Sequence, residues 1–146
     1  MIIKGFTITA GARHATHLLK TDENEHVLVQ EMRGFVSDDL HGAFAESQAI
    51  ARGTKCQQHL FSCAFSPPES APLSSDQFLH AIDKTEQALG LDGQPRAIVF
   101  HEKDGRRHAH CVWSRIDAET MKARPLPHWK TKLGHVSRGL HSEFGI

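Results

Sequence analysis

The chain has 146 residues, which suits one domain with a buried core, and we expect residues 1–146 to form a single domain. Its three cysteines, Cys56, Cys63 and Cys111, are an odd set without Cys-x-x-Cys spacing, so no disulfide framework is expected. The sequence has no apolar run near 18 residues and no secretory leader. These features predict a cytoplasmic protein without a membrane span.

The formal net charge is zero, but the charges are unevenly spread. Residues 96–141 hold ten Lys or Arg against four Asp or Glu, a balance of +6, so the rest of the chain carries −6. A basic half of this kind is what a polyanion site needs. A solvent-exposed surface with an uneven charge distribution and no binding role fits the same count equally well.

The first half of the chain alternates strand and helix patterns. Alternating β-branched residues predict a strand over residues 1–9, and a short helix is expected over residues 12–20. A second strand follows over residues 27–35, and Ser37 is expected to cap a helix that Gly53 ends. Residues 59–65 are short and apolar and predict a third strand, which ends before Pro67.

The second half begins with a helix capped by Ser74 or Ser75 and stopped by Gly90. Strands are expected over residues 96–101 and 107–116, and a last helix over residues 130–144. The order of these elements predicts an α+β fold, in which helices pack on one face of a mainly antiparallel sheet of about five strands. The other face is then expected to be open.

The two last strands form a hairpin around Asp104-Gly105, a pair that readily adopts the positive φ angles of a type I′ turn. With these two residues in the loop, His101 lies directly opposite His108. Side chains alternate along a strand, so His110 shares the face of His108. We expect the three imidazoles to converge on one point and to bind a divalent metal, with open positions left on the ion.

A His-x-His pair on a strand is also common as a solvated edge, and twelve histidines in the chain place some pairs by chance. The cross-strand His101 and the apolar reverse face, with Ile98, Phe100, Ala109, Cys111 and Trp113, favour the metal site. The pattern does not determine which metal binds.

The segment His101-Glu102-Lys103-Asp104-Gly105-Arg106-Arg107-His108-Ala109-His110-Cys111-Val112-Trp113 resembles the metal-binding motif of plasmid mobilisation relaxases. These enzymes belong to the His-hydrophobic-His superfamily of single-strand endonucleases. The resemblance extends to residues 17–25, 33–35 and 93–96, and it implies the α+β relaxase fold with the metal and DNA site on the open face.

The resemblance implies a reaction and its partners. Relaxases nick single-stranded DNA at a transfer origin by transesterification and keep the 5′ phosphoryl group on the enzyme, and accessory relaxosome proteins can assist them. On this basis His101, His108 and His110 are expected to hold Mn²⁺ or Mg²⁺, with Zn²⁺ as an alternative, and the ion polarises the scissile phosphate. We expect this activity to serve conjugative mobilisation.

The chain departs from most relaxases because it contains no tyrosine, the usual nucleophile. His17 lies in the corresponding helix, and some relaxases use histidine instead. We expect His17 to attack phosphorus, with Glu23 or Glu25 holding the imidazole tautomer. We expect five basic residues to contact backbone phosphates: Arg106, Arg107, Arg115, Lys122 and Arg124.

Two other functions stay open on the sequence. The chain can be a relaxase-like DNA-binding module that has lost catalysis. A nucleotide hydrolase of the histidine-triad kind also uses alternating histidines, but Val112 stands where such an enzyme needs a third one.

Overall fold

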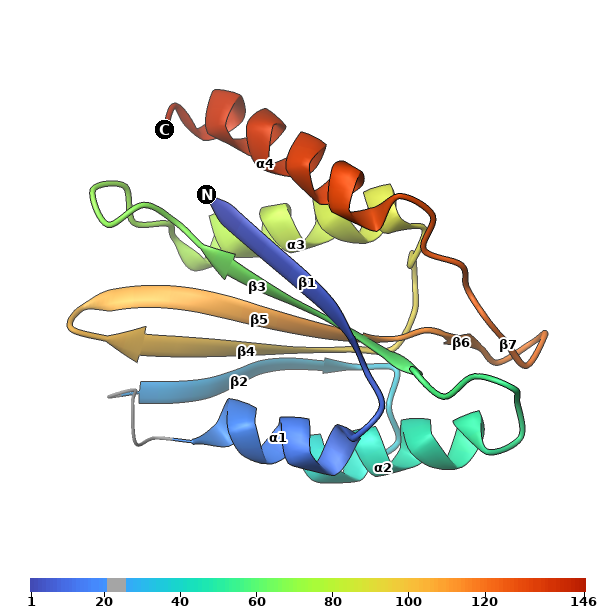
Figure 1. Ribbon diagram of the computed structural model, residues 1–146. Coiled ribbons are helices and arrows are strands. Elements are labelled where there is room, and N and C mark those ends of the chain that lie inside the picture. Colours follow the sequence, from blue (N-terminus) through green and yellow to red (C-terminus); the bar gives the residue numbers. More distant parts are fainter. Residues whose placement is uncertain (21–25) are drawn as a thin grey trace.

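The computed structural model describes residues 1–20 and 26–146, which form one sheet of five strands, a small two-stranded sheet and four helices (Figure 1). The elements in chain order are β1 (Ile2–Ile8), α1 (Gly11–Leu19), β2 (His26–Arg33), α2 (Leu40–Ala51), β3 (Leu60–Ser66), α3 (Ser75–Leu89), β4 (Arg96–Lys103), β5 (Arg106–Ser114), β6 (Ile116–Asp117), β7 (Lys122–Ala123) and α4 (Trp129–Phe144). The predicted α+β fold class is confirmed. The short β6–β7 hairpin was not predicted.

The large sheet has the strand order β1-β3-β5-β4-β2, and every neighbouring pair is antiparallel. β3, β5 and β4 lie in the middle, while β1 and β2 are the edges. The middle strands are buried over most of their length because their residues are apolar on both sides. The sheet therefore has to be covered on both faces.

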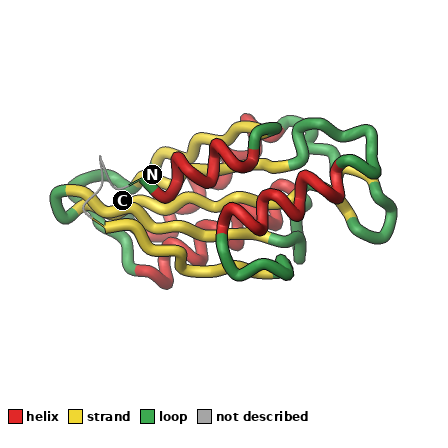
Figure 2. Tube along the Cα trace, turned by 90° about the horizontal axis from the view of Figure 1, so that it is seen from below, coloured by secondary structure: helices red, strands yellow, loops and turns green. Residues whose placement is uncertain are grey.

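Helices cover both faces, so the expectation of one covered face and one open face is wrong in this respect. α3 and α4 pack on the face of Ile98, Cys111 and Trp113, and α1 and α2 pack on the histidine face. Figure 1 shows the two layers on either side of the sheet, and Figure 2 shows helices lying across the strands. The physical reason is that Val99 and Val112 share the histidine face and also need burial.

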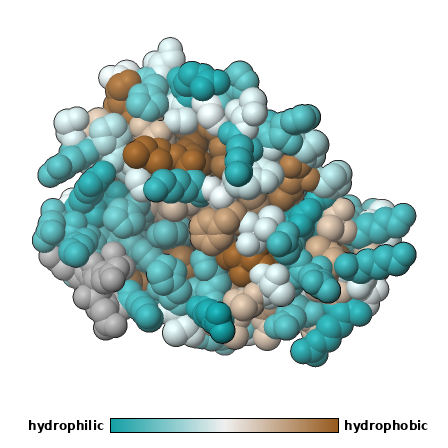
Figure 3. All heavy atoms as spheres, viewed as in Figure 1, coloured by the Kyte–Doolittle hydropathy of each residue, from teal (hydrophilic) through white to brown (hydrophobic). Residues whose placement is uncertain are grey.

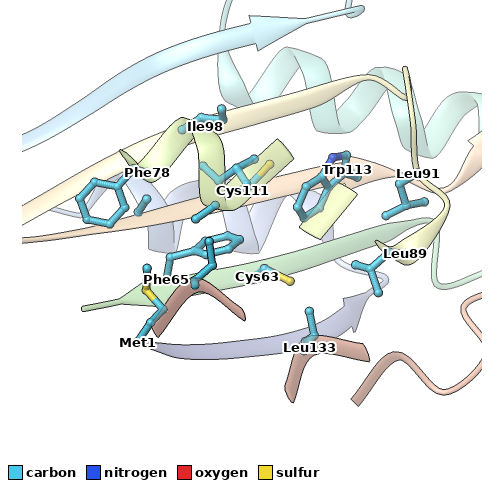
Figure 4. Packing of buried hydrophobic residues seen from close by; sticks show 14 of the residues in the cluster. Met1, Cys63, Phe65, Phe78, Leu89, Leu91, Ile98, Cys111, Trp113 and Leu133 are labelled. Carbon is cyan, nitrogen blue, oxygen red and sulfur yellow. The ribbon is translucent and has the colours of Figure 1, made fainter. Parts of the chain in front are cut away.

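The larger core lies between the sheet and the helices α3 and α4, and it includes Phe65, Phe78 and Trp113 (Figure 4). Beside it, the buried carboxylate of Glu86 accepts a hydrogen bond from Trp113 Nε1 at 2.9 Å and one from Arg96 Nη1 at 3.2 Å. Arg33 Nη2 also donates to Glu86. This network joins β2, β4 and β5 to α3.

The observed ends of α3 agree with the prediction from the sequence, whereas the observed N-cap of α2 differs from it. Ser74 caps α3 in a capping box with Gln77, and Gly90 ends the helix in the left-handed conformation, as predicted. α2 is capped by Asp39, which accepts from Gly42 N at 2.6 Å, and not by Ser37. The hydroxyl of Ser37 instead accepts from the amide of Asp39. None of the helices in the described residues has the length and apolarity needed to cross a bilayer.

Candidate active site

The β4–β5 hairpin has the register predicted from its turn. Asp104 and Gly105 have φ angles of 54° and 73°, so both adopt the left-handed conformation of a type I′ turn. His101 lies opposite His108. His110 is two residues further along β5, on the same face of the sheet. The hairpin therefore brings three imidazoles together beside α1.

The three imidazole rings lie close together, but they do not surround a common point. The centroids of His101 and His110 are 4.5 Å apart, whereas His108 lies 6.1 Å from His101 and 6.2 Å from His110. Two imidazoles bound to one ion have centroids about 4.5 to 5.5 Å apart, because each metal–nitrogen bond is about 2.1 Å. Within the described part of the chain, no three His, Cys, Asp or Glu side chains stand in metal-binding positions. His108 would have to turn toward the other two rings.

A hydrogen bond connects His101 to the end of α1. His101 Nε2 lies 2.6 Å from the carbonyl oxygen of Leu18, and a carbonyl only accepts, so Nε2 carries the proton. In the neutral ring this leaves Nδ1 of His101 with a free lone pair. The same bond holds the end of α1, which carries His17, against β4.

The surroundings keep these imidazoles neutral. Burial, together with the smaller effects of the neighbouring histidines His101, His108, His14 and His17, lowers the pKa of His110 to about 3. Burial also lowers the pKa of His101 and of His108. Since a neutral imidazole is the form that binds a metal, the donor set is chemically suited to a divalent ion.

His17 is exposed on α1 and lies close enough to this cluster to contribute to the lowered pKa of both His101 and His110. The ring of His14, one turn earlier, stacks between His17 and Phe44, with centroids 6.2 and 6.3 Å away. His14 Nε2 lies 3.0 Å from Ser62 Oγ in β3. His14 was not predicted as a site residue, although its position three residues before His17 places both on the same side of the helix and could have indicated it.

The predicted acidic partners of His17, Glu23 and Glu25, lie outside the described residues. Their relation to His17 stays a prediction.

The two arginines at the hairpin tip point to different places. Arg106 is exposed, donates to the carbonyl of Pro67 at 3.1 Å, and lies close enough to His108 to lower its pKa. Arg107 turns to the opposite face, where it donates to Ser75 Oγ and stacks over the ring of Phe100 at 5.1 Å. Arg106 is thus beside the histidines, and Arg107 is bound into the α3 layer.

The other three predicted basic residues lie beyond the far end of β5. Arg115 and Lys122 line a surface groove of about 990 Å³ together with Arg52 and Lys55, which were not singled out from the sequence. Arg124 donates to the carbonyl oxygens of Gly90 and Asp92. At about 3.4 Å per strand residue, Arg115 is about 17 Å from His110 along β5. These residues are therefore not part of the histidine site.

Comparison with known proteins agrees with the fold. The family model for the relaxase nuclease domain, MobA/VirD2-like, matches residues 12–146, which include the three hairpin histidines and His17. No curated protein matches the chain. The chain belongs to the MobA/VirD2-like family of plasmid mobilisation relaxases and carries its nuclease domain.

Proposed function

We propose that this relaxase domain nicks single-stranded DNA at a transfer origin by transesterification and keeps the 5′ phosphoryl group on His17. The observation that supports this most directly is the hydrogen bond from His101 Nε2 to the carbonyl of Leu18. It holds the residue next to His17 against the three hairpin histidines. A nucleophile and a phosphate-polarising centre are thereby neighbours, as an in-line displacement needs.

His17 supplies the attacking nitrogen. The lone pair of the neutral imidazole forms a bond to phosphorus, and the bond from phosphorus to the 3′ oxygen breaks. The 3′ oxygen takes a proton from water and leaves as a hydroxyl, while the second ring nitrogen of His17 gives up its proton. Glu23 or Glu25 is the proposed acceptor for that proton. The product is a phosphoramidate that stores the energy of the broken diester.

His101, His108 and His110 are the proposed ligands of a divalent ion. Their neutral state fits this role, and we propose that the half-buried His108 ring turns so that its nitrogen joins those of the other two. The ion, Mn²⁺ or Mg²⁺, with Zn²⁺ as an alternative, supplies Lewis-acid polarisation of the scissile phosphate when it is bound. Arg106, exposed at the hairpin tip, is the proposed contact for a neighbouring phosphate.

The test is a nicking assay with Mn²⁺ or Mg²⁺ on overlapping single-stranded oligonucleotides from the DNA that flanks the gene for this chain. We expect one oligonucleotide to yield a free 3′ hydroxyl fragment and an acid-labile covalent adduct with the protein. His17→Ala should abolish the adduct, and His135→Ala, which changes an exposed histidine on α4, should retain it.

Persistence of the adduct in His17→Ala would exclude His17 as the nucleophile. If the protein binds these oligonucleotides but forms no adduct with any of them, the non-catalytic DNA-binding module is the better account.

A further inference from the structure

One end of the histidine face is left uncovered by the helices, along the edge strand β1. The side chains of Ile2, Lys4 and Phe6 alternate onto this face, because their partners in β3 are Ser66, Ala64 and Ser62. Ile2 is 60% exposed and Phe6 is 47% exposed, whereas Ile8, further along β1, is buried. We call Ile2, Lys4 and Phe6 the β1 strip.

The β1 strip lies beside the histidine site in the register of the sheet. Lys4 pairs with Ala64 of β3, and Ala64 pairs with His110 of β5. Strands are about 4.8 Å apart, so the backbone of Lys4 is about 10 Å from that of His110. Ala64, which lies between them on β3, has a short side chain.

Phe6 is suited to stack on a flat ring. Of the large hydrophobic side chains exposed in the described residues, Phe6 is the one aromatic member. The edge-to-face contact with His14, at 5.7 Å and 87°, fixes its orientation. The two tryptophans are not available for this role, since Trp113 is buried and Trp129 packs edge-on against Phe61 on the other face.

The composition of the strip matches an unpaired nucleotide. Phe6 and Ile2 give apolar surface for bases, and the exposed Lys4 between them gives a cation for the phosphate that links two nucleotides. Figure 3 shows apolar surface among hydrophilic side chains across the middle of the side on which β1 lies in front in Figure 1. An apolar strip interrupted by a lysine favours nucleic acid over a purely apolar partner.

We infer that the β1 strip is a nucleotide subsite, in which an unpaired base next to the scissile phosphate stacks on Phe6 while Lys4 binds the adjoining phosphate. This inference rests on the proposed function, because it takes single-stranded DNA as the ligand. It assigns to β1 a recognition role that is separate from the chemistry of His17.

The test measures binding without cleavage, in the presence of a chelator, by fluorescence anisotropy. The probes are labelled oligothymidylate and an abasic strand of the same length, which has the same phosphates and no bases. Phe6→Ala should weaken oligothymidylate binding about 5- to 150-fold and leave the abasic strand unchanged, since base stacking is the lost interaction. Lys4→Ala should weaken both strands equally and reduce the salt dependence.

Leu28→Ala is the matched control. Leu28 is 55% exposed, but it lies on the opposite edge strand and faces away from the histidines, because its partner is Phe100. It should bind both strands as the unmutated chain does. Phe6→Leu keeps the apolar contact with His14 and should still lose oligothymidylate affinity, with a melting temperature close to that of the unmutated chain.

Equal oligothymidylate affinity in Phe6→Ala and the unmutated chain would overturn the subsite and leave the proposed function intact. Unchanged oligothymidylate affinity in Phe6→Leu would exclude base stacking on Phe6. A change of oligomeric state in Phe6→Ala without a change in DNA affinity would identify the β1 strip as a contact between copies of the chain. If the unmutated chain binds neither strand, the proposed function is contradicted, and the subsite that rests on it is contradicted as well.

Discussion

His14 should make the stability of the domain depend on pH in a way that can be measured. Its ring is buried, and burial together with the neighbouring His17 lowers the pKa of His14 to about 4. In the unfolded chain a histidine has a pKa of about 6.5, so between pH 6.5 and 4 the unfolded state binds more protons. The stabilising contribution is complete above pH 6.5 and is lost as the pH falls toward 4.

The size of the effect follows from the two pKa values. With 4 in the folded state and 6.5 in the unfolded state, the free energy of unfolding falls by about 2 kcal/mol between pH 7.5 and pH 5. His14→Asn removes this titration, and its shorter side chain loses the bond of Nε2 to Ser62 Oγ equally at both pH values, so that loss cancels in the pH difference. The variant should therefore lose about 2 kcal/mol less than the unmutated chain over the same interval.

The assay is urea unfolding at pH 7.5 and pH 5 with a chelator present, for both proteins. Half-buried His110 titrates in the same direction in both, and His14 is only a minor cause of its lowered pKa after burial, His101 and His108, so most of its contribution cancels in the difference between them. His135→Asn, on the exposed side of α4, should keep the pH dependence of the unmutated chain. Equal pH dependence in His14→Asn and the unmutated chain would refute the buried, neutral state of His14.

Three further predictions concern the core, the turn and the ligand set. Glu86→Gln should lower the free energy of unfolding by about 2 to 4 kcal/mol, because Arg33 and Nη1 of Arg96 lose their buried carboxylate. A loss below about 1 kcal/mol in urea unfolding would contradict this. Gly105→Ala should cost about 1 to 2 kcal/mol by the same measurement, because φ is 73° there, and an unchanged midpoint would mean that the turn tolerates a side chain. His108→Ala should abolish tight Mn²⁺ binding in calorimetry, and an unchanged affinity would exclude the three-histidine site.

The parts of the fold that could be predicted are those with local causes. Asp104-Gly105 determines a turn and hence the register of His101 and His108, without any help from distant residues. Ser74 and Gly90 likewise mark the ends of α3 through backbone groups within one turn. The sequence also indicates that both faces need to be covered, since the apolar Val99 lies on the same face of β4 as His101.

The parts that could not be predicted depend on contacts between distant segments. His14 becomes a buried neighbour of the site only because α1 packs across β3, where Ser62 is 48 positions away. Arg115 and Lys122 meet Arg52 because β5, the β6–β7 hairpin and the end of α2 come together. Net charge along the sequence could indicate a basic half, but it could not separate these cations from Arg106 at the site.

If His17 carries the DNA, it is the residue in the covalent adduct, and identifying that residue tests the proposed function directly. The protein is incubated with the oligonucleotide that it cleaves, digested with nuclease and protease at neutral pH, and analysed by mass spectrometry. We expect a nucleotide on the peptide that contains His17, and mild acid should release it, as it releases a phosphoramidate. A nucleotide on any other residue, His14 included, would contradict it.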